Sequence, residues 1–137
     1  LRRQRVAAMI VDTSALRAII LGEPDAERVL ARMTDVGELA VSAASRVEAA
    51  IVAEAKGGPE AADDLQALLA DLECAVLPFD EEQATVAAQA WHRFGKGRHP
   101  AGLNLGDCYA YAAAKVSGRP LLFKGQDFAQ TDVAAAG

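Results

Sequence analysis

Short apolar runs alternate with longer amphipathic segments along the 137 residues of this chain. Several runs are too short for helices and end at polar or turn-forming residues, so they predict strands at residues 8–11, 38–41, 75–79 and 121–123. Between these runs, apolar residues recur at the spacing of an amphipathic helix. This spacing predicts helices at residues 15–21, 25–33, 60–72, 81–94 and 105–116, and another that begins at Ser42 or Ser45 and ends before Gly57.

Strands that alternate with helical segments predict an α/β fold in three layers, α/β/α, around a central, mostly parallel sheet. Ligands of such sheets bind beyond the carboxyl ends of the strands. The length suits one domain, and neither a repeat nor a linker interrupts the pattern. We expect a single domain over residues 9–137, with residues 1–8 as an N-terminal extension or remnant ahead of Met9.

Composition narrows the class of protein. The formal net charge of −5 becomes −8 when the three arginines of residues 1–8 are left out. Such an acidic domain does not suit general nucleic-acid binding by phosphate neutralisation, but it suits a metal-dependent site or a basic partner protein. Cys74 and Cys108 lack the spacing of metal ligands, which is typical of reduced thiols in the cytoplasm. No apolar run is long enough for a membrane span and no signal peptide is visible, so we expect a cytoplasmic protein.

Acidic residues stand where strands end and helices begin. Asp12 and Asp127 follow predicted strands, Glu48 lies near the start of a helix, and Asp107 opens the alanine-rich helix at 105–116. Parallel strands place their carboxyl ends at one edge of the sheet, so we expect these four side chains to meet there. Gathered carboxylates repel one another and require a hard divalent cation, Mg²⁺ or Mn²⁺. The pattern therefore predicts a metal site of the kind that cleaves phosphodiesters.

Each acid also has a structural interpretation. Asp107 suits the positive end of a helix dipole, and Glu48 suits a capping box with Ser45. Asp127 suits the turn in which it lies. Asp12 is harder to explain in this way, because an acid beside a buried strand is costly without a partner. The joint placement of the four acids carries more weight than any one of them.

Other polar residues have two interpretations at this stage. Ser14 is expected to hydrogen-bond a carboxylate or water, or to cap its helix. Lys124, Arg17 and the basic loop at residues 95–102 are the local sources of positive charge for a phosphate substrate, although a solvated loop is the slightly favoured interpretation of residues 95–102. Trp91 and Phe94 are expected in the core or at a dimer interface rather than as base-stacking platforms. The apolar faces of the first two helices are expected to form core or a partner groove.

Four segments resemble the PIN-domain ribonucleases, with the closest likeness to the toxins of VapBC toxin–antitoxin systems. They occur in the family's order, from Met9 to about Val133, nearly the whole chain. The segments are residues 9–16 (MIVDTSAL), 45–48 (SRVE), 103–108 (LNLGDC) and 121–128 (LLFKGQDF).

The resemblance implies a PIN-like α/β/α fold and a metal-dependent endoribonuclease toxin that hydrolyses RNA. It also implies neutralisation by a VapB-type antitoxin and a homodimer. Carried over by position, the acidic quartet of Asp12, Glu48, Asp107 and Asp127 is both catalytic and metal-binding, with Mg²⁺ or Mn²⁺ as the cofactor. Ser14 matches a polar position beside the first aspartate. Gln126 departs from the family pattern, where Asn is commoner, in a way that should not affect the metal.

Two other functions compete with this prediction. A receiver-like phospho-acceptor domain also uses an acidic Mg²⁺ pocket at strand ends and a lysine near the last strand, here Lys124. It would need an acid paired with Asp12 and an aspartate that ends a mid-chain strand, and neither is visible in the sequence. The other alternative is a catalytically inactive PIN-like module that only binds a partner.

Overall fold

The structure alternates short strands with helices from Met9 onward. The computed structural model describes residues 8–136, so the predicted extension lies, apart from Ala8, outside the described residues. The strands are β1 (Met9–Val11), β2 (Leu39–Ser42), β3 (Ala75–Leu77) and β4 (Leu121–Leu122). The helices are α1 (Thr13–Ile20), α2 (Ala26–Thr34), α3 (Ala43–Gly57), α4 (Pro59–Asp71), α5 (Glu81–Phe94), α6 (Leu105–Ser117) and the 3₁₀ helix η1 (Phe128–Gln130).

The four strands form one parallel sheet in the order β3-β2-β1-β4. β1 lies in the interior of this sheet, where Met9 is in register with Leu39 of β2 and Ile10 with Leu121 of β4. All three residues of β1 are buried and apolar, as expected for a parallel strand that is covered on both faces. The predicted parallel sheet is confirmed.

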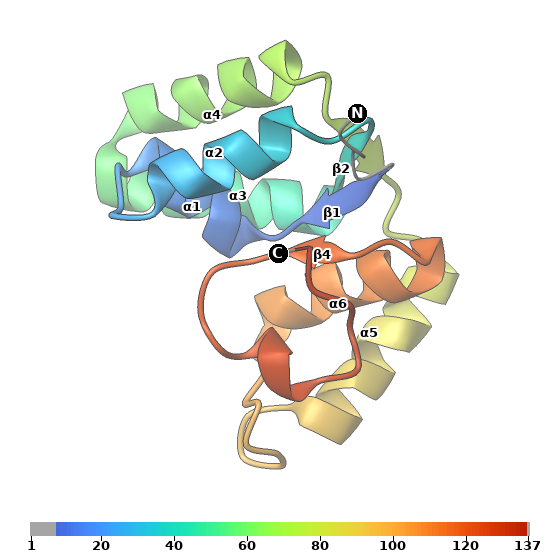
Figure 1. Cartoon of the computed structure of the whole chain (residues 1–137). Coiled ribbons are helices and arrows are strands. Elements are labelled where there is room, and N and C mark those ends of the chain that lie inside the picture. The colour runs from blue at the N-terminus through green and yellow to red at the C-terminus, as the bar shows by residue number, and fades with distance from the viewer. Residues whose placement is uncertain (1–7, 137) are drawn as a thin grey trace.

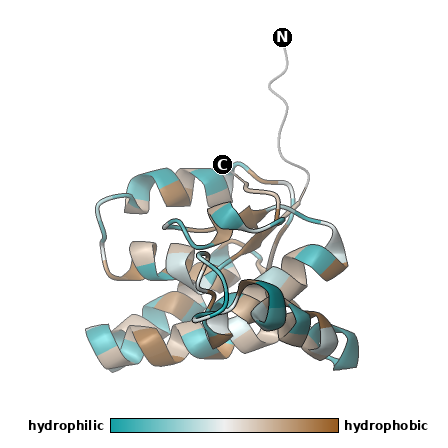
Figure 2. Ribbon diagram, turned by 90° about the horizontal axis from the view of Figure 1, so that it is seen from below, coloured by the Kyte–Doolittle hydropathy of each residue, from teal (hydrophilic) through white to brown (hydrophobic). Residues whose placement is uncertain are grey.

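The sheet separates two layers of helices (Figure 1). Successive strand residues face opposite sides, so Met9 and Val11 pack with the core residues of α1 to α4, while Ile10 packs with those of α5 and α6. The strands stand out as hydrophobic between these layers (Figure 2). The predicted three-layer α/β/α fold is confirmed, and it brings the carboxyl end of β1 close to the starts of α1, α3 and α6.

Some predicted boundaries were wrong by a few residues. β3 ends at Leu77 and β4 has only two residues, because the chain turns away sooner than the apolar runs suggested. α3 begins at Ala43, and the hydroxyl of Ser42 accepts a hydrogen bond from the N–H of Ala44, so Ser42 rather than Ser45 is its N-cap. α4 begins at Pro59, a favourable first position because proline lacks the N–H that would be unpaired there.

The inner face of α3 consists of small residues. Ser45, Ala49 and Ala53 are buried against the body, whereas Val47 and Ile51 are 59% and 64% exposed. Small side chains allow α3 to pack closely on α1 and α4. The larger apolar residues of the predicted amphipathic pattern therefore lie on the outside of the molecule.

The remaining apolar predictions are met in part. Leu16 and Val29 of the first two helices belong to the core. Phe94 is buried, but Trp91 is 44% exposed on the surface of α5 and is not a core residue. Within residues 8–136, none of the helices combines the length and the apolar character needed to cross a membrane.

Candidate functional site

Asp12 joins the sheet to α1. Its backbone N–H donates to the carbonyl of Leu122 at 2.9 Å, which continues the pairing of β1 with β4. Its side chain caps α1 by accepting a hydrogen bond from the N–H of Ser14 at 3.0 Å. Ser14, for which a capping role was one interpretation, is thus a helical residue. The pKa of Asp12 is raised to about 6, mainly by burial and also by the charge of Glu48, while the hydrogen bonds from Ser14 oppose this rise.

Glu48 lies six residues beyond the N-cap of α3, so it is not the capping-box partner of Ser45. Its Oε1 accepts a hydrogen bond from the hydroxyl of Thr13 at 2.7 Å. The Thr13 hydroxyl also lies 3.3 Å from the carbonyl oxygen of Ser45. Thr13 therefore ties the carboxylate of α3 to the start of α1. The sequence offered one signal for this role, a second polar residue directly after Asp12.

Gly106 allows α6 to approach Glu48. A Cβ atom at this position would collide with the carboxylate of Glu48, whose atoms are its three nearest neighbours. Only glycine fits here without a shift of the helix or of Glu48. Gly106 is a site residue that the sequence analysis missed, although it directly precedes Asp107.

Asp107 occupies the first turn of α6 in a complete capping box. Its N–H donates to Oδ1 of Asn104 at 2.8 Å, and its Oδ2 accepts from the N–H of Asn104 at 3.0 Å. The structural interpretation of this acid is therefore correct, but it does not exclude a second role. Burial raises the pKa of Asp107 to about 7, helped by the charges of Asp12 and Asp127 and by hydrogen bonding to Asp127.

Asp127 follows β4 and stands at the start of η1, where its exposed side chain makes no capping hydrogen bond. Its influence on the pKa of Asp107 places the two carboxylates close together. The quartet is thus gathered as a series of neighbours, from Glu48 through Asp12 and Asp107 to Asp127. A cleft of about 280 Å³ opens beside it; Asp12, Glu48 and Asp107 line the cleft together with Thr13, Ser14, Arg17, Val52 and Asn104.

The side chains as they stand do not surround a common point. Among residues 8–136, no group of three or more His, Cys, Asp or Glu side chains is arranged to hold a metal ion. Asp12, Glu48 and Asp107 each turn toward a protein hydrogen-bond donor, which separates their charges. The donor set itself, carboxylate oxygens in a partly buried cleft, is the kind that Mg²⁺ and Mn²⁺ prefer. The pKa values of Asp12 and Asp107 are raised mainly by burial, and the charges of neighbouring carboxylates add to the rise.

The two cations expected beside the site are held by other acids. Glu23 accepts from Arg17 Nε at 2.9 Å and from Lys124 Nζ at 2.8 Å, and Asp25 lies 3.2 Å from the same ammonium. The backbone N–H of Lys124 donates to Oγ of Ser14 at 2.9 Å. Ser14 therefore links the turn that carries Asp127 to the helix that Asp12 caps, and its side chain also hydrogen-bonds Asp12.

Comparisons with known proteins place the chain. The PIN domain family matches residues 9–134. A Ribonuclease VapC from Mycolicibacterium smegmatis is 50% identical over 127 residues, which is 93% of this chain and 98% of that protein. VapC20 of Mycobacterium tuberculosis, a sarcin–ricin loop cleaving toxin, has a TM-score of 0.76 at 18% identity over 92% of this chain and 96% of its own. A toxin–antitoxin complex from Klebsiella pneumoniae has a TM-score of 0.65 at 17% identity, over 90% of this chain and 92% of the chain it matches.

At such identities the two solved structures support the fold alone, whereas the family match and the M. smegmatis relative support the assignment. The predicted resemblance is confirmed, and neither the receiver-like domain nor the inactive module is favoured. The chain belongs to the PIN domain family and, within it, to the VapC ribonucleases.

Proposed function

We propose that the chain is a metal-dependent endoribonuclease that hydrolyses RNA phosphodiesters at the acidic cleft. The acidic cleft carries the proposal, because Asp12, Glu48 and Asp107 come from distant segments and line it together, with Asp127 near Asp107. The match to a Ribonuclease VapC supports it. Acids at such an edge face the place where ligands of parallel sheets bind. The quartet is the proposed catalytic set.

Mg²⁺ or Mn²⁺ is the proposed cofactor, held by Asp12, Glu48, Asp107 and Asp127. When bound, the cation supplies a Lewis acid that stabilises negative charge on the phosphate and makes a water molecule more acidic. Its positive charge would also lower the pKa values of Asp12 and Asp107, so that both carboxylates are ionised at neutral pH.

The surrounding residues fix the quartet before substrate arrives. The hydroxyl of Thr13 donates a hydrogen bond to Oε1 of Glu48, and the N–H of Asn104 donates one to Oδ2 of Asp107. Each of these hydrogen bonds leaves the second carboxylate oxygen for a ligand. Because the donors belong to the first turns of α1 and to the cap of α6, the acids are positioned by helix ends rather than by flexible loops.

A cleavage assay on total RNA tests the proposal. With Mg²⁺ or Mn²⁺ the parent protein should cut RNA, EDTA should stop the reaction, and Asp12→Asn should reduce the rate by at least about 1,000-fold. Asp64→Asn, the same change at an exposed position of α4, is the matched control and should retain the parent rate. Full activity of Asp12→Asn, or activity that persists in EDTA, would contradict the assignment of the metal site.

An antitoxin of the VapB type and a second copy of the chain are the proposed protein partners. The Klebsiella pneumoniae structure, a toxin–antitoxin complex of the same fold, supports the first. Exposed apolar side chains support the second: Val47 and Ile51 flank Glu48 along α3, and Leu105 is 68% exposed beside Gly106. Since Gly106 contacts Glu48, these three residues lie in one region of the surface. Sedimentation of a Val47→Ser, Ile51→Ser double variant tests the dimer.

A further inference from the structure

The basic loop, residues 95–102, is attached directly to the acidic cleft. The N–H of Leu103 donates to the carbonyl of Phe94, and the N–H of Lys96 donates to the carbonyl of Leu103, both at 2.9 Å. Leu103 immediately precedes Asn104, the residue that caps α6 and holds Asp107. The base of the loop is therefore fixed one residue away from the lining of the cleft.

The loop also has an ordered backbone. The carbonyl of Gly95 accepts from the N–H groups of Arg98 and His99 at 2.9 and 3.1 Å, and the N–H of Gly102 donates to the carbonyl of His99 at 2.9 Å. The imidazole of His99 packs edge-on against the ring of Phe94, with centroids 5.1 Å apart. The backbone hydrogen bonds are those of ordinary turns. They fix the directions from which Lys96 and Arg98 extend.

The charge of this region is opposite to that of the chain. Residues 83–106 contain no Asp or Glu, although the protein as a whole has a net charge of −5. Lys96 and Arg98 are exposed, and neither forms an ion pair with a carboxylate of residues 8–136. Their charges are available to a partner outside the molecule.

Trp91 adds an aromatic surface to these cations. Its indole is 44% exposed, and the guanidinium of Arg98 lies 4.5 Å from the centre of the ring. An exposed ring with a stacked arginine, next to an unpaired lysine, is typical of surfaces that bind single-stranded nucleic acid.

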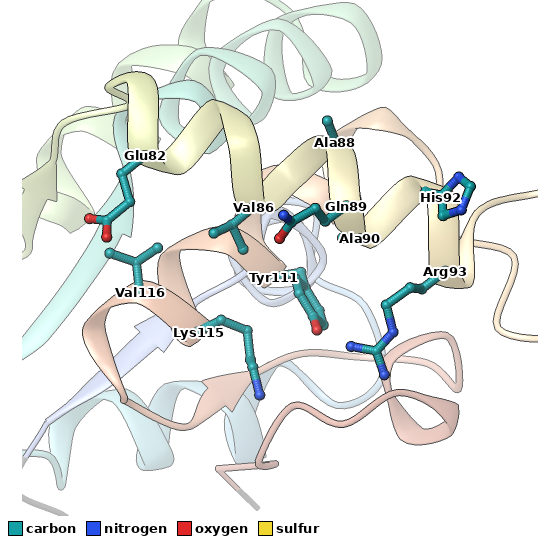
Figure 3. A pocket seen from close by; sticks show the side chains of 10 residues that line it. All are labelled: Glu82, Val86, Ala88, Gln89, Ala90, His92, Arg93, Tyr111, Lys115 and Val116. Carbon is teal, nitrogen blue, oxygen red and sulfur yellow. The ribbon is translucent and has the colours of Figure 1, made fainter.

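A hollow of about 750 Å³ between α5 and α6 offers a contrast (Figure 3). Arg93 of α5 and Lys115 of α6 extend into the same region of this hollow. Both pair with Asp132, at 3.4 and 3.3 Å, and Asp132 also accepts a hydrogen bond from Tyr111 at 2.6 Å. The charges of this hollow are balanced within the fold, so it offers less to a phosphate than the basic loop does.

We infer that the basic loop and Trp91 bind the single strand of RNA that extends from the acidic cleft. Lys96 and Arg98 contact its phosphates, and Trp91 with the guanidinium above it provides a stacking surface for a base. This inference rests on the proposed ribonuclease function, which it deepens by assigning a second contact region. Charge complementarity selects a strand with one phosphate per nucleotide as the occupant.

Fluorescence anisotropy with a labelled single-stranded RNA of about 20 nucleotides tests the binding. All measurements use the Asp12→Asn background, in which cleavage is blocked. Lys96→Gln with Arg98→Gln should raise Kd about tenfold at low salt, and the slope of log K against log salt should become shallower by about 1.4, because two phosphate contacts are lost. Lys56→Gln, which removes an exposed charge at the far end of α3 from Glu48, should leave both quantities unchanged.

Cleavage by the otherwise parental enzyme separates this inference from the proposed function. The double variant should raise KM for the long RNA and leave the cleavage of a dinucleotide unchanged, because the single phosphodiester of a dinucleotide lies at the quartet and leaves no phosphate for the loop. A parent that cleaves neither RNA would remove the ribonuclease proposal. A parent that cleaves both, with a double variant of unaltered Kd and salt slope, would overturn only the role of the loop. Loss of a dimer without loss of RNA binding in Trp91→Ala would instead assign the surface to a second copy of the chain and overturn it as well.

Discussion

Two groups of cations flank the acidic cleft, and they differ in what holds them. Arg17 and Lys124 form a rim beside Asp12, and both are paired with Glu23. Lys96 and Arg98 belong to the basic loop, which precedes Asn104 in the chain. They have no carboxylate partner among residues 8–136. The rim has acids in the adjacent turn between α1 and α2, whereas the basic loop lies within a long stretch without any acid.

The difference shows that proximity to the site does not make a cation available to substrate. Hydrogen bonding to Lys124 is the main cause that lowers the pKa of Glu23, so the pair is ionised at neutral pH and the ammonium is occupied. Lys124 instead has a structural role. Its N–H binds Ser14 and its Nζ binds Glu23, which fixes the turn that leads to Asp127.

The largest effect on RNA cleavage is expected from adding a side chain at Gly106, where α6 contacts Glu48. Gly106→Ala should reduce the rate of RNA cleavage at least about 100-fold, because the added Cβ displaces Glu48 or α6 by a distance that disturbs the quartet. The free energy of unfolding should change by less than about 1 kcal/mol, because the colliding atoms are the far end of the flexible Glu48 side chain and alanine favours a helix over glycine. Steady-state kinetics and urea denaturation measure the two effects. In the Asp12→Asn background, RNA binding through the basic loop should be unchanged.

A second substitution separates collision from other causes. In the Glu48→Ala protein the atoms with which the new Cβ collides are absent, so Gly106→Ala should not reduce the residual cleavage rate further. A further loss would show that Gly106 is required for some reason other than its contact with Glu48.

An intermediate effect is expected from the repulsion inside the cleft. The pKa of Asp107 is raised to about 7 from an ordinary value of 3.8, so the folded state retains a proton that the unfolded state releases. The free energy of unfolding should therefore fall as pH rises from about 4 to about 7, and Asp12 contributes with the same sign. In EDTA at pH 8, Asp107→Asn should stabilise the protein by about 1–2 kcal/mol after allowance for solvent screening.

This gain should disappear below about pH 3, where the carboxyl is protonated in both states. The asparagine keeps an oxygen for the N–H of Asn104, so loss of the capping box does not obscure the comparison. Glu60→Gln in the first turn of α4 is the control for removing an acid from a helix start. A less stable Asp107→Asn protein at pH 8 would contradict the repulsion between the carboxylates.

The sequence was sufficient where local chemistry decides the structure. Residues 9–11 can only be a buried strand, so Asp12 had to lie at a carboxyl end of the sheet. Asp107 follows Asn104 at the spacing of a capping box, and an acid in the first turn of α6 was correctly expected. The gathering of the quartet followed from the parallel topology, without knowledge of any single contact.

Prediction failed for features that depend on contacts between segments far apart in the sequence. Whether Ser42 or Ser45 caps α3 depends on how far β2 pairs with its neighbours, and this sets the position of Glu48 along its helix. The outward position of Val47 results from close packing of α3 on other helices, which a periodic pattern does not specify. The ion pair of Lys124 with Glu23 joins residues 101 positions apart, so its cation seemed available for RNA.

The smallest effect, a change in the affinity for RNA, is expected from removing the Glu23 carboxylate that pairs with the cations of the rim. Glu23→Gln removes the carboxylate that pairs with Arg17 and Lys124, so Arg17 becomes available to phosphate, while Asp25 still holds Lys124. Binding of the RNA of about 20 nucleotides should tighten about threefold in the Asp12→Asn background, and the salt dependence should become steeper. These changes are opposite in sign to those expected from the basic loop variants. In the active enzyme kcat should fall slightly, because the turn that carries Asp127 loses one of its anchors.

Glu27→Gln is the matched control, since it removes an exposed acid from α2 without touching either cation. Glu23→Asp, which keeps the charge, should resemble the parent more closely than Glu23→Gln does. If Glu23→Gln and Glu27→Gln tighten RNA binding equally, only the overall charge has changed, and pairing is not what keeps the rim from the substrate. If Glu23→Gln alone tightens it, the chain contains two cationic contact regions, and pairing of Arg17 with Glu23 keeps one of them from the substrate.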